Sequence, residues 1–280
     1  MDTPLPDGPD ANDKNLRAEI DRRLEVALQI AREAGRLTLQ YFQNPQLAIE
    51  LKHDATPVTV ADRQAELLLR ERIAAAFKSD AILGEEFPEQ PGTSGFRWIL
   101  DPIDGTKSFI RGVPLYGTLV GVEHAGRSQI GVIYIPCLDE CVWAAVGQGA
   151  WYQKGAAPPL PARVSKCERL ADALFCTSDA KTFGEANRQP EFANLLAGCR
   201  LMRTWGDCYG YLLVATGRAD LMVDAIMSVW DAAALQPILE EAGGTFTDWR
   251  GVSTIHSGEG LGTNGRILGE VLAAIGGGKK

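Results

Sequence analysis

The sequence predicts a layered α/β or α+β protein, in which helices pack on two β-sheets. Three features of the chain support this prediction: an amphipathic helix pattern near its beginning, a β-rich middle with two hairpin signals, and an alternation of strands and helices in its second half. The 280 residues, 45% of them hydrophobic and 23% charged, can form a large core in one extended domain or in two coupled lobes.

Helix patterns dominate the first part of the chain. Apolar residues recur at helical spacing in residues 16–42 and again in residues 60–77, as expected for helices with one buried face. Asn44-Pro45 ends the first of these helices. Between and after the two helices, short apolar runs predict three strands, at residues 48–51, 81–83 and 96–100.

The middle of the chain has the pattern of two β-hairpins. Residues 118–136 give two β-rich runs around the turn dipeptide Ala125-Gly126. A second pair of runs, in residues 140–155, surrounds a Gly-Gln-Gly turn.

Strands and helices alternate in the second half. The predicted strands and helices, in chain order, are a strand at 173–177, helices at 190–197 and 208–216, a strand at 219–223, a helix at 231–242 and a strand at 244–247. Pro237 lies inside the last helix and should bend it or remove one of its backbone hydrogen bonds.

The predicted organisation has three parts. The acidic, Pro-rich start of the chain is expected to be a disordered tail at residues 1–14. A Pro-rich stretch at 156–161 marks the expected boundary between an N-terminal α+β lobe at 15–155 and a C-terminal α/β lobe at 156–277.

Composition and motif searches exclude several classes of function. The formal net charge of −8 argues against nucleic-acid binding, and no apolar run is long enough to predict a membrane span. The first residues lack the pattern of a signal peptide, so we expect a cytoplasmic protein with its six cysteines reduced. The three histidines form no zinc-binding or hydrolase pattern, and no Walker P-loop or dinucleotide fingerprint is present. Any chemistry must therefore depend mainly on carboxylates.

The segment DPIDGTKSF, residues 101–109, concentrates such groups where a predicted strand ends. Asp101 and Asp104 lie three residues apart, and Pro102 is expected to stop the strand, so two carboxylates enter one small volume. Like charges this close repel unless a cation lies between them, and carboxylates are typical ligands of Mg²⁺. Gly105-Thr106 can turn the backbone N–H groups toward an anion at the start of a short helix. The alternative interpretation is an Asp-rich turn with a helix cap.

Four further acidic residues, in three segments of the chain, could join this site. Glu85 and Glu86 follow Gly84 at the end of a predicted strand. Asp231 lies at a helix start, where it could equally be a capping residue, and Asp62 could equally be an ordinary acid of a first helical turn.

Together these motifs resemble the inositol monophosphatase family of Mg²⁺-dependent, lithium-sensitive phosphatases. The segment DPIDGTKSF, with Gly-Glu-Glu upstream and WDAAALQPILEEAGG downstream, carries a resemblance that covers residues 16–274. The resemblance implies an αβαβα sandwich, a homodimer, two or three Mg²⁺ ions per active site and a small phosphate ester as the substrate. It also implies a metal-ligand set of Glu85, Asp101, the Ile103 carbonyl, Asp104 and Asp231, a weaker third metal site at Asp62 supported by Lys52, and a phosphate-binding turn at Gly105 and Thr106.

The family mechanism implied by this resemblance needs no covalent intermediate. Two metal ions about 3.5–4 Å apart act as a pair. One ion, held by Glu85 and Asp101, lowers the pKa of a water that Thr106 and Glu85 orient for in-line attack on phosphorus. The other, held by Asp101, Asp104 and Asp231, neutralises the leaving ester oxygen.

The chain resembles the histidinol-phosphate phosphatase branch of the family most closely. The resemblance lies in KSFIRGVPLYGTLVGV and in residues 203–220, and an acid, Asp224, lies seven residues before Asp231, where the family has a substrate-contacting acid. Histidinol phosphate carries an ammonium and an imidazole, which Asp207 and Asp224 could hold while Trp205 or Tyr209 flanks the ring.

Several alternatives stay open at this point. Trp205 and Tyr209 could be core residues on a helix, and Asp207 could cap the helix that follows it. The substrate could instead be inositol 1-phosphate, another sugar monophosphate or a 3′(2′),5′-bisphosphate nucleotide, although the last would need a basic pocket for its second phosphate. An inactive, phosphatase-like binding protein is the alternative from a different class.

Overall fold

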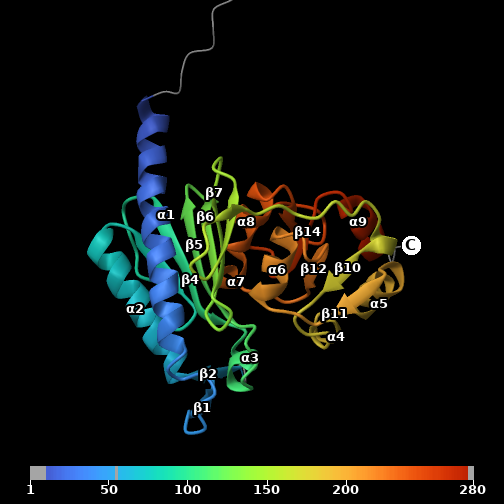
Figure 1. Cartoon of the computed structure of the whole chain (residues 1–280), viewed down its shortest axis with the longest axis horizontal. Helices are drawn as coiled ribbons and strands as arrows, with labels where there is room; N and C mark the ends of the chain where they lie inside the picture. Colours follow the sequence, from blue (N-terminus) through green and yellow to red (C-terminus); the bar gives the residue numbers. More distant parts are fainter. Residues whose placement is uncertain (1–10, 54–55, 277–280) are drawn as a thin grey trace, which may run out of the picture.

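The chain forms five layers in the order α–β–α–β–α, as the sequence predicted (Figure 1). The computed structural model describes residues 11–53 and 56–276. Helices α1 (Ala11–Thr38) and α2 (Val60–Ala76) cover the outer face of a seven-stranded sheet. Helices α6 (Cys208–Ala215) and α8 (Leu235–Glu241) lie between this sheet and a five-stranded sheet. The outer face of the second sheet packs against α5 (Gln189–Gly198) and α9 (Leu268–Gly276).

The first sheet contains both predicted hairpins. Its strands run in the order β3-β4-β5-β6-β7-β8-β9, and only β3 and β4 are parallel. The first hairpin turns at Ala125 and Gly126, whose φ angles of 51° and 75° match a tight two-residue turn. The strands are β3 (Ala81–Gly84), β4 (Phe96–Asp104), β5 (Gly117–His124), β6 (Arg127–Ile135), β7 (Glu140–Ala145), β8 (Ala150–Lys154) and β9 (Leu160–Pro161).

The second sheet combines a parallel core with an antiparallel edge. Its order is β11-β10-β12-β14-β13, in which β10 lies parallel to both β11 and β12. The strands are β10 (Leu174–Cys176), β11 (Leu201–Arg203), β12 (Leu221–Asp224), β13 (Thr245–Thr247) and β14 (Gly260–Thr263). A separate two-stranded hairpin and three short helices complete the regular structure, namely β1 (Ile49–Leu51), β2 (Pro57–Thr59), α3 (Thr106–Ile110), α4 (Thr182–Glu185) and α7 (Val229–Ala232), together with a 3₁₀ turn at Leu170–Asp172.

The helix predicted at residues 231–242 is divided into α7 and α8. Pro237 has no N–H to offer the carbonyl of Ala233, four residues earlier, and the helix is interrupted at Ala233. The Ser128 hydroxyl from β6 supplies the missing hydrogen bond to that carbonyl at 2.8 Å. A Cβ atom at Gly131 would lie 2.0 Å from the Ala234 carbonyl oxygen. The glycine therefore allows the backbone between α7 and α8 to pack directly on β6. The predicted effect of the proline is confirmed, and the break places α7 beside the end of β4.

Several boundaries differ from the sequence prediction. Helix α1 ends at Thr38, before Asn44-Pro45, and turns follow it. Pro102 does not end β4, which continues to Asp104 with a shift of register between Asp101 and Asp104. The extra residue forms a bulge on β4 opposite β5, and Pro102 lies within this bulge, where it needs no ladder hydrogen bond. Helix α1 begins at Ala11, so the end of the expected tail, residues 11–14, is helical, and residues 1–10 lie outside the described residues.

The lobe boundary stays a prediction. The strand β9 still pairs with β8 of the first sheet, so the Pro-rich stretch after residue 155 contributes one more strand to that sheet. No helix in the described part of the chain is long and apolar enough to cross a membrane.

Candidate active site

A cavity of about 350 Å³ opens where strands of both sheets end, beside α3, α6 and α7. Its lining comes from the bulge and turn after β4, the loop after β10, the start of α6, the end of β12 and helix α7. Because several strands from both sheets end at this cavity, side chains far apart in the sequence converge there.

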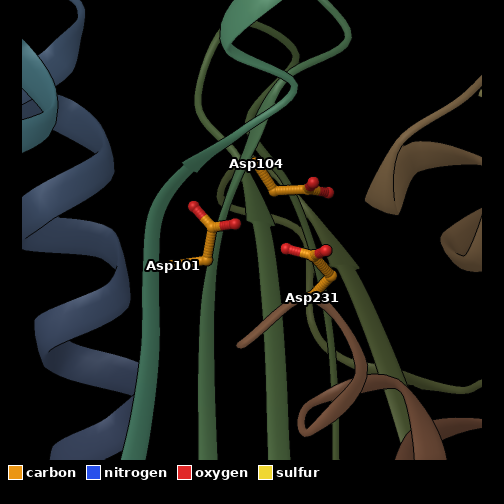
Figure 2. Close-up of side chains that lie close together, drawn as sticks. All are labelled: Asp101, Asp104 and Asp231. Atoms are coloured by element: carbon orange, nitrogen blue, oxygen red, sulfur yellow. The ribbon is translucent and has the colours of Figure 1, made fainter. Parts of the chain in front are cut away.

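Three carboxylates form the acidic centre of this region. Asp101, Asp104 and Asp231 each offer an oxygen within 4.8 Å of the other two. Figure 2 shows Asp101 and Asp104 projecting from the same strand toward Asp231, which approaches from a separate segment. The structure therefore brings together acids that lie up to 130 residues apart in the sequence, the separation of Asp101 and Asp231.

The bulge in β4 explains how one strand presents two acids to one volume. Asp101 pairs with Leu119 and Asp104 pairs with Gly117, so three residue steps on β4 face two on β5. The Asp101 Oδ1 atom accepts the Ile103 N–H at 3.0 Å, which stabilises the bulge. Without the extra residue, the two side chains would follow the alternation of a regular strand and point to opposite faces.

Asp231 reaches the cluster from the first turn of α7. Its Oδ2 atom accepts the Ser228 N–H at 2.7 Å in a capping box, so the helix-capping interpretation is correct. The same side chain lies in the acidic cluster, so capping and metal binding are compatible roles here. Gly121 on β5 allows this approach, because a Cβ atom there would lie 2.7 Å from that of Ala233.

The electrostatics of the cluster favour a bound cation. Burial raises the pKa of Asp101 well above its usual value, and the carboxylates of Glu85, Asp104 and Asp231 raise it further. Burial also raises the pKa of Asp231, to about 7, against the Ser228 hydrogen bond that lowers it. Oxygen ligands with uncompensated negative charge are the donor set that a hard divalent cation prefers. The residues present therefore fit a metal ion.

Glu85 lies beside this cluster at the end of β3. It lines the cavity, and one of its oxygens accepts a 2.8 Å hydrogen bond from the Lys52 ammonium, which also donates to Glu86 at 2.7 Å. Burial raises the pKa of Glu85, while the bond from Lys52 opposes that increase. Lys52 therefore contacts two carboxylates beside the cavity, although it is not among the described residues that line it.

The predicted phosphate-binding turn also lines the cavity. Gly105 has a φ of 90°, which an L-residue rarely adopts, and a Cβ atom there would lie 2.6 Å from Asp207 Oδ2. Thr106 begins α3, and its hydroxyl donates to the Ile103 carbonyl at 3.1 Å. A role in phosphate binding stays a prediction for both residues.

Asp207 does not cap α6 with its side chain. Its φ of 32° is unusual for a non-glycine residue, and its carboxylate instead accepts a 3.4 Å hydrogen bond from the Ser108 hydroxyl. Asp224, at the end of β12, accepts hydrogen bonds of 3.0 Å from the Ser178 N–H and from the Tyr211 hydroxyl. Burial raises the pKa of Asp224 to about 6. Both acids line the cavity on the side of α6 and β12.

The predicted aromatic wall lies elsewhere. Trp205 precedes α6 and is 40% exposed, and Tyr209 packs near the Arg218 guanidinium, so neither is among the described residues lining the cavity. The aromatic residue that lines the cavity is Tyr211, which the sequence analysis missed. The sequence could not distinguish Tyr211 from Tyr209, because it did not show which face of the helix is turned toward the cavity. Ser178 was also missed, although a Ser-Asp pair directly after a strand resembles the pattern of the first motif.

Asp62 lies apart from the three-carboxylate cluster. Its Oδ2 atom accepts the N–H and the hydroxyl of Thr59 at 2.8 and 2.7 Å in the capping box of α2, as the alternative interpretation predicted. Its Oδ1 atom is buried and has no hydrogen-bond partner within the described residues. Such an orphaned oxygen fits a further cation. The third metal site stays a prediction.

Comparisons with known proteins identify the family of this chain. The sequence profile of the inositol monophosphatase family matches residues 19–276. The chain is 46% identical to a histidinol-phosphatase of Chlorobaculum parvum, over 92% of this chain and 98% of the relative. It is 37% identical to a histidinol-phosphatase of Mycobacterium tuberculosis, over 90% of this chain and 97% of the relative. The crystal structure of the extragenic suppressor protein SuhB from Bartonella henselae matches with a TM-score of 0.83 and 30% identity, over 91% of this chain and 98% of that one.

The family profile spans almost the whole described chain, and two relatives exceed 30% identity over nearly their full length. The fold, the carboxylate cluster and the sequence relatives all lead to the same conclusion. This chain belongs to the inositol monophosphatase family and is a phosphatase.

Proposed function

We propose that this phosphatase hydrolyses L-histidinol phosphate to L-histidinol and phosphate with the help of Mg²⁺. The charge of the cavity is the main support for this substrate. The described residues that line it include one lysine, Lys107, and six acids, namely Glu85, Asp104, Asp179, Asp207, Asp224 and Asp231. If metal ions compensate the charges of Glu85, Asp104 and Asp231, and Lys107 pairs with Asp179 at 3.5 Å, the charges of Asp207 and Asp224 remain for the substrate.

A substrate that is only an anion does not suit this surplus of negative charge. Histidinol phosphate carries an ammonium beside its phosphate ester, and this cation can be held by Asp207 and Asp224. The ring of inositol 1-phosphate has no positive charge to offer these carboxylates. A bisphosphate nucleotide would bring a second phosphate to a cavity with one lysine. The two relatives at 46% and 37% identity, both named histidinol-phosphatases, also support this choice.

The proposed metal ligands are Glu85, Asp101, Asp104, Asp231 and the Ile103 carbonyl, with Asp62 at a weaker site. Lys52 is proposed to support that site and to contact the substrate. When bound, Mg²⁺ would act as a Lewis acid that activates water and neutralises developing charge on the ester oxygen. The Thr106 hydroxyl donates to the Ile103 carbonyl, so its lone pairs are left to accept a hydrogen bond from a water in the cavity. Glu85 on the same wall would accept the second hydrogen bond of this water, and the two bonds together would aim its oxygen at phosphorus.

A panel of phosphate esters tests the substrate. We expect Mg²⁺-dependent phosphate release with a kcat/KM at least about tenfold higher for histidinol phosphate than for inositol 1-phosphate or adenosine 3′,5′-bisphosphate. A preference of that size for inositol 1-phosphate would overturn the substrate and keep the reaction class. Phosphate release from none of the esters would favour the inactive binding protein.

Substitution of Asp224 tests the proposed contact with the ammonium. Asp224→Asn removes the charge. Its amide oxygen can keep the hydrogen bond from the Ser178 N–H, and its NH₂ group can donate to the Tyr211 hydroxyl oxygen in place of the bond that this hydroxyl now donates. A lost charged contact of about 1.5–3 kcal/mol lowers kcat/KM for histidinol phosphate roughly 10- to 100-fold. The variant's kcat/KM for 4-nitrophenyl phosphate, which has no ammonium, should stay near the wild-type value. An equal loss for both esters would contradict the contact.

We also propose a cytoplasmic homodimer. All six cysteines are free thiols, which suits a reducing compartment. The dimer rests on the family resemblance, and sedimentation analysis of the purified chain tests it, because a monomer at micromolar concentration would contradict it.

A further inference from the structure

A buried acid of helix α2, Glu66, contacts the backbone of the turn that carries Glu85. Glu66 is fully buried, and its Oε2 atom accepts the Glu86 N–H at 2.7 Å. Its Oε1 atom lies so close to Gly84 that a Cβ atom there would be 2.1 Å away. Glu66 therefore contacts the residue before Glu85 and the residue after it.

Arg70, one helical turn further along α2, fixes Glu66 in place. Its Nε atom donates to Glu66 Oε1 at 2.7 Å, and its Nη2 atom donates to the Phe87 carbonyl at 3.0 Å. Arg70 thus connects the buried carboxylate to the chain two residues beyond Glu85. A planar guanidinium that makes both bonds leaves little freedom to the turn.

The contacts of Glu66 and Arg70 differ in kind from those of Lys52. Lys52 contacts the side-chain oxygens of Glu85 and Glu86, so it competes for the same atoms that a metal ion would use. The hydrogen bonds that Glu66 and Arg70 make to this turn go to its backbone, at the Glu86 N–H and the Phe87 carbonyl, and do not use the Glu85 carboxylate. Neither is among the described residues that line the cavity. Their contacts can therefore set the direction of the Glu85 side chain without touching substrate or metal.

We propose that Glu66 and Arg70 are positioning residues that aim the Glu85 carboxylate at the metal site. This inference rests on the proposed role of Glu85 as a metal ligand. Groups that orient a metal ligand typically change metal affinity about 10- to 100-fold when they are substituted. The expected signature is weaker Mg²⁺ binding, with kcat at saturating Mg²⁺ changed much less than the affinity.

Two substitutions separate positioning from bulk stability. Glu66→Gln has one acceptor oxygen for two donors, so it must leave either the Glu86 N–H or the Arg70 Nε–H without its partner. Arg70→Lys keeps the positive charge and loses the bond that spans to the Phe87 carbonyl. If Glu66→Gln fails to fold, Arg70→Lys still supplies the measurement.

A matched pair of control variants comes from the other end of β3. Asp80 and Arg23 form a buried ion pair with two hydrogen bonds, at 2.8 and 2.9 Å, and make no contact with the Glu85 turn. Asp80→Asn and Arg23→Lys make the same chemical changes as the two test variants. They should lower the melting temperature while leaving the Mg²⁺ dissociation constant within about twofold of wild type.

The experiment titrates Mg²⁺ into each substrate-free protein by calorimetry and follows the melting temperature with and without Mg²⁺. We expect the Mg²⁺ dissociation constant of Glu66→Gln and Arg70→Lys to rise about 10- to 100-fold, unlike that of the controls. Wild-type protein that binds Mg²⁺ while both test variants bind it equally well would overturn this inference alone. Wild-type protein that binds no Mg²⁺ would overturn the proposed function and this inference with it.

Discussion

The two ends of the parallel pair β3–β4 treat buried carboxylates in opposite ways. At the start of β3, Asp80 accepts two hydrogen bonds from Arg23 and one each from Ser94 and Trp98. At the far end, the carboxylates of Asp101, Asp104 and Asp231 face one another, and the hydrogen bonds that they accept come from backbone N–H groups.

The pKa directions express this difference. Burial would raise the pKa of Asp80, but the bonds from Arg23, Ser94 and Trp98 outweigh it and the pKa is lowered. Burial raises the pKa of Asp104 well above its usual value, and the nearby Asp207 and Asp231 raise it further. A buried acid whose countercharge comes from the chain stabilises the fold. Buried acids that face only one another create a demand for a cation from solution.

The largest expected loss of activity is at the far end of β3–β4, where Asp101, Asp104 and Asp231 face one another; we call this the acidic end. Asp104→Asn keeps an oxygen for the Cys208 N–H but removes one negative charge from the cluster. Loss of several kcal/mol of charge stabilisation corresponds to at least about a 10³-fold decrease in kcat/KM, measured as Mg²⁺-dependent phosphate release. The melting temperature should stay equal or rise, because a like-charge repulsion is relieved. Near-full activity of this variant would contradict the mechanism.

The sequence predicted the acidic end better than the other end of β3–β4, which holds the Arg23–Asp80 ion pair and which we call the paired end. Asp101 and Asp104 lie in one short motif, so their spacing and the turn residues beside them already indicated a shared site. The pair of Arg23 and Asp80 spans 57 positions and joins a helix to a strand, so no local pattern announces it. The bulge that directs Asp101 and Asp104 to one side could not be predicted from the sequence either. A proline predicts that a strand is interrupted, but it does not show whether the strand continues beyond it.

The substrate side of the cavity shows the same limit. Asp207 and Asp224 were found through the family resemblance, whereas Tyr211 depended on which face of α6 turns inward. A helix that is apolar on all sides, as α6 is, lacks a polar stripe that would fix its orientation. The aromatic prediction therefore chose Trp205 and Tyr209, which lie six and two residues before Tyr211 in the sequence. Neither is among the described residues that line the cavity.

The second largest expected effect is a loss of stability when the ion pair at the paired end is broken. Arg23→Met leaves Asp80 buried without its countercharge, and breaking a buried ion pair in this way destabilises a protein by about 3–5 kcal/mol. The free energy of unfolding in urea measures the loss. The variant also forfeits the contacts of the guanidinium with the rings of Phe96 and Phe77. The kcat of the folded fraction should equal that of wild type, and a specific loss of Mg²⁺ binding would contradict the division of roles between the two ends.

The smallest effect is the pH dependence of stability that the Arg23–Asp80 pair produces. Because the pKa of folded Asp80 is lowered, the stability that it contributes is complete above its unfolded pKa of about 4 and is lost as the pH falls through the folded value. Asp80→Asn cannot titrate, so the difference in unfolding free energy between wild type and this variant should be constant from pH 5 to pH 6, as an ordinary carboxyl is ionised there at roughly 90% or more. The difference should shrink steadily below about pH 4, because Asp80 of the unfolded wild-type chain takes up a proton there while Asp80 of the folded chain stays ionised. A difference that stays constant down to about pH 3 would mean that Asp80 ionises alike in folded and unfolded chains. In that case Arg23 would not hold the charge of Asp80, and the contrast between the two ends of β3–β4 would rest on the acidic cluster alone.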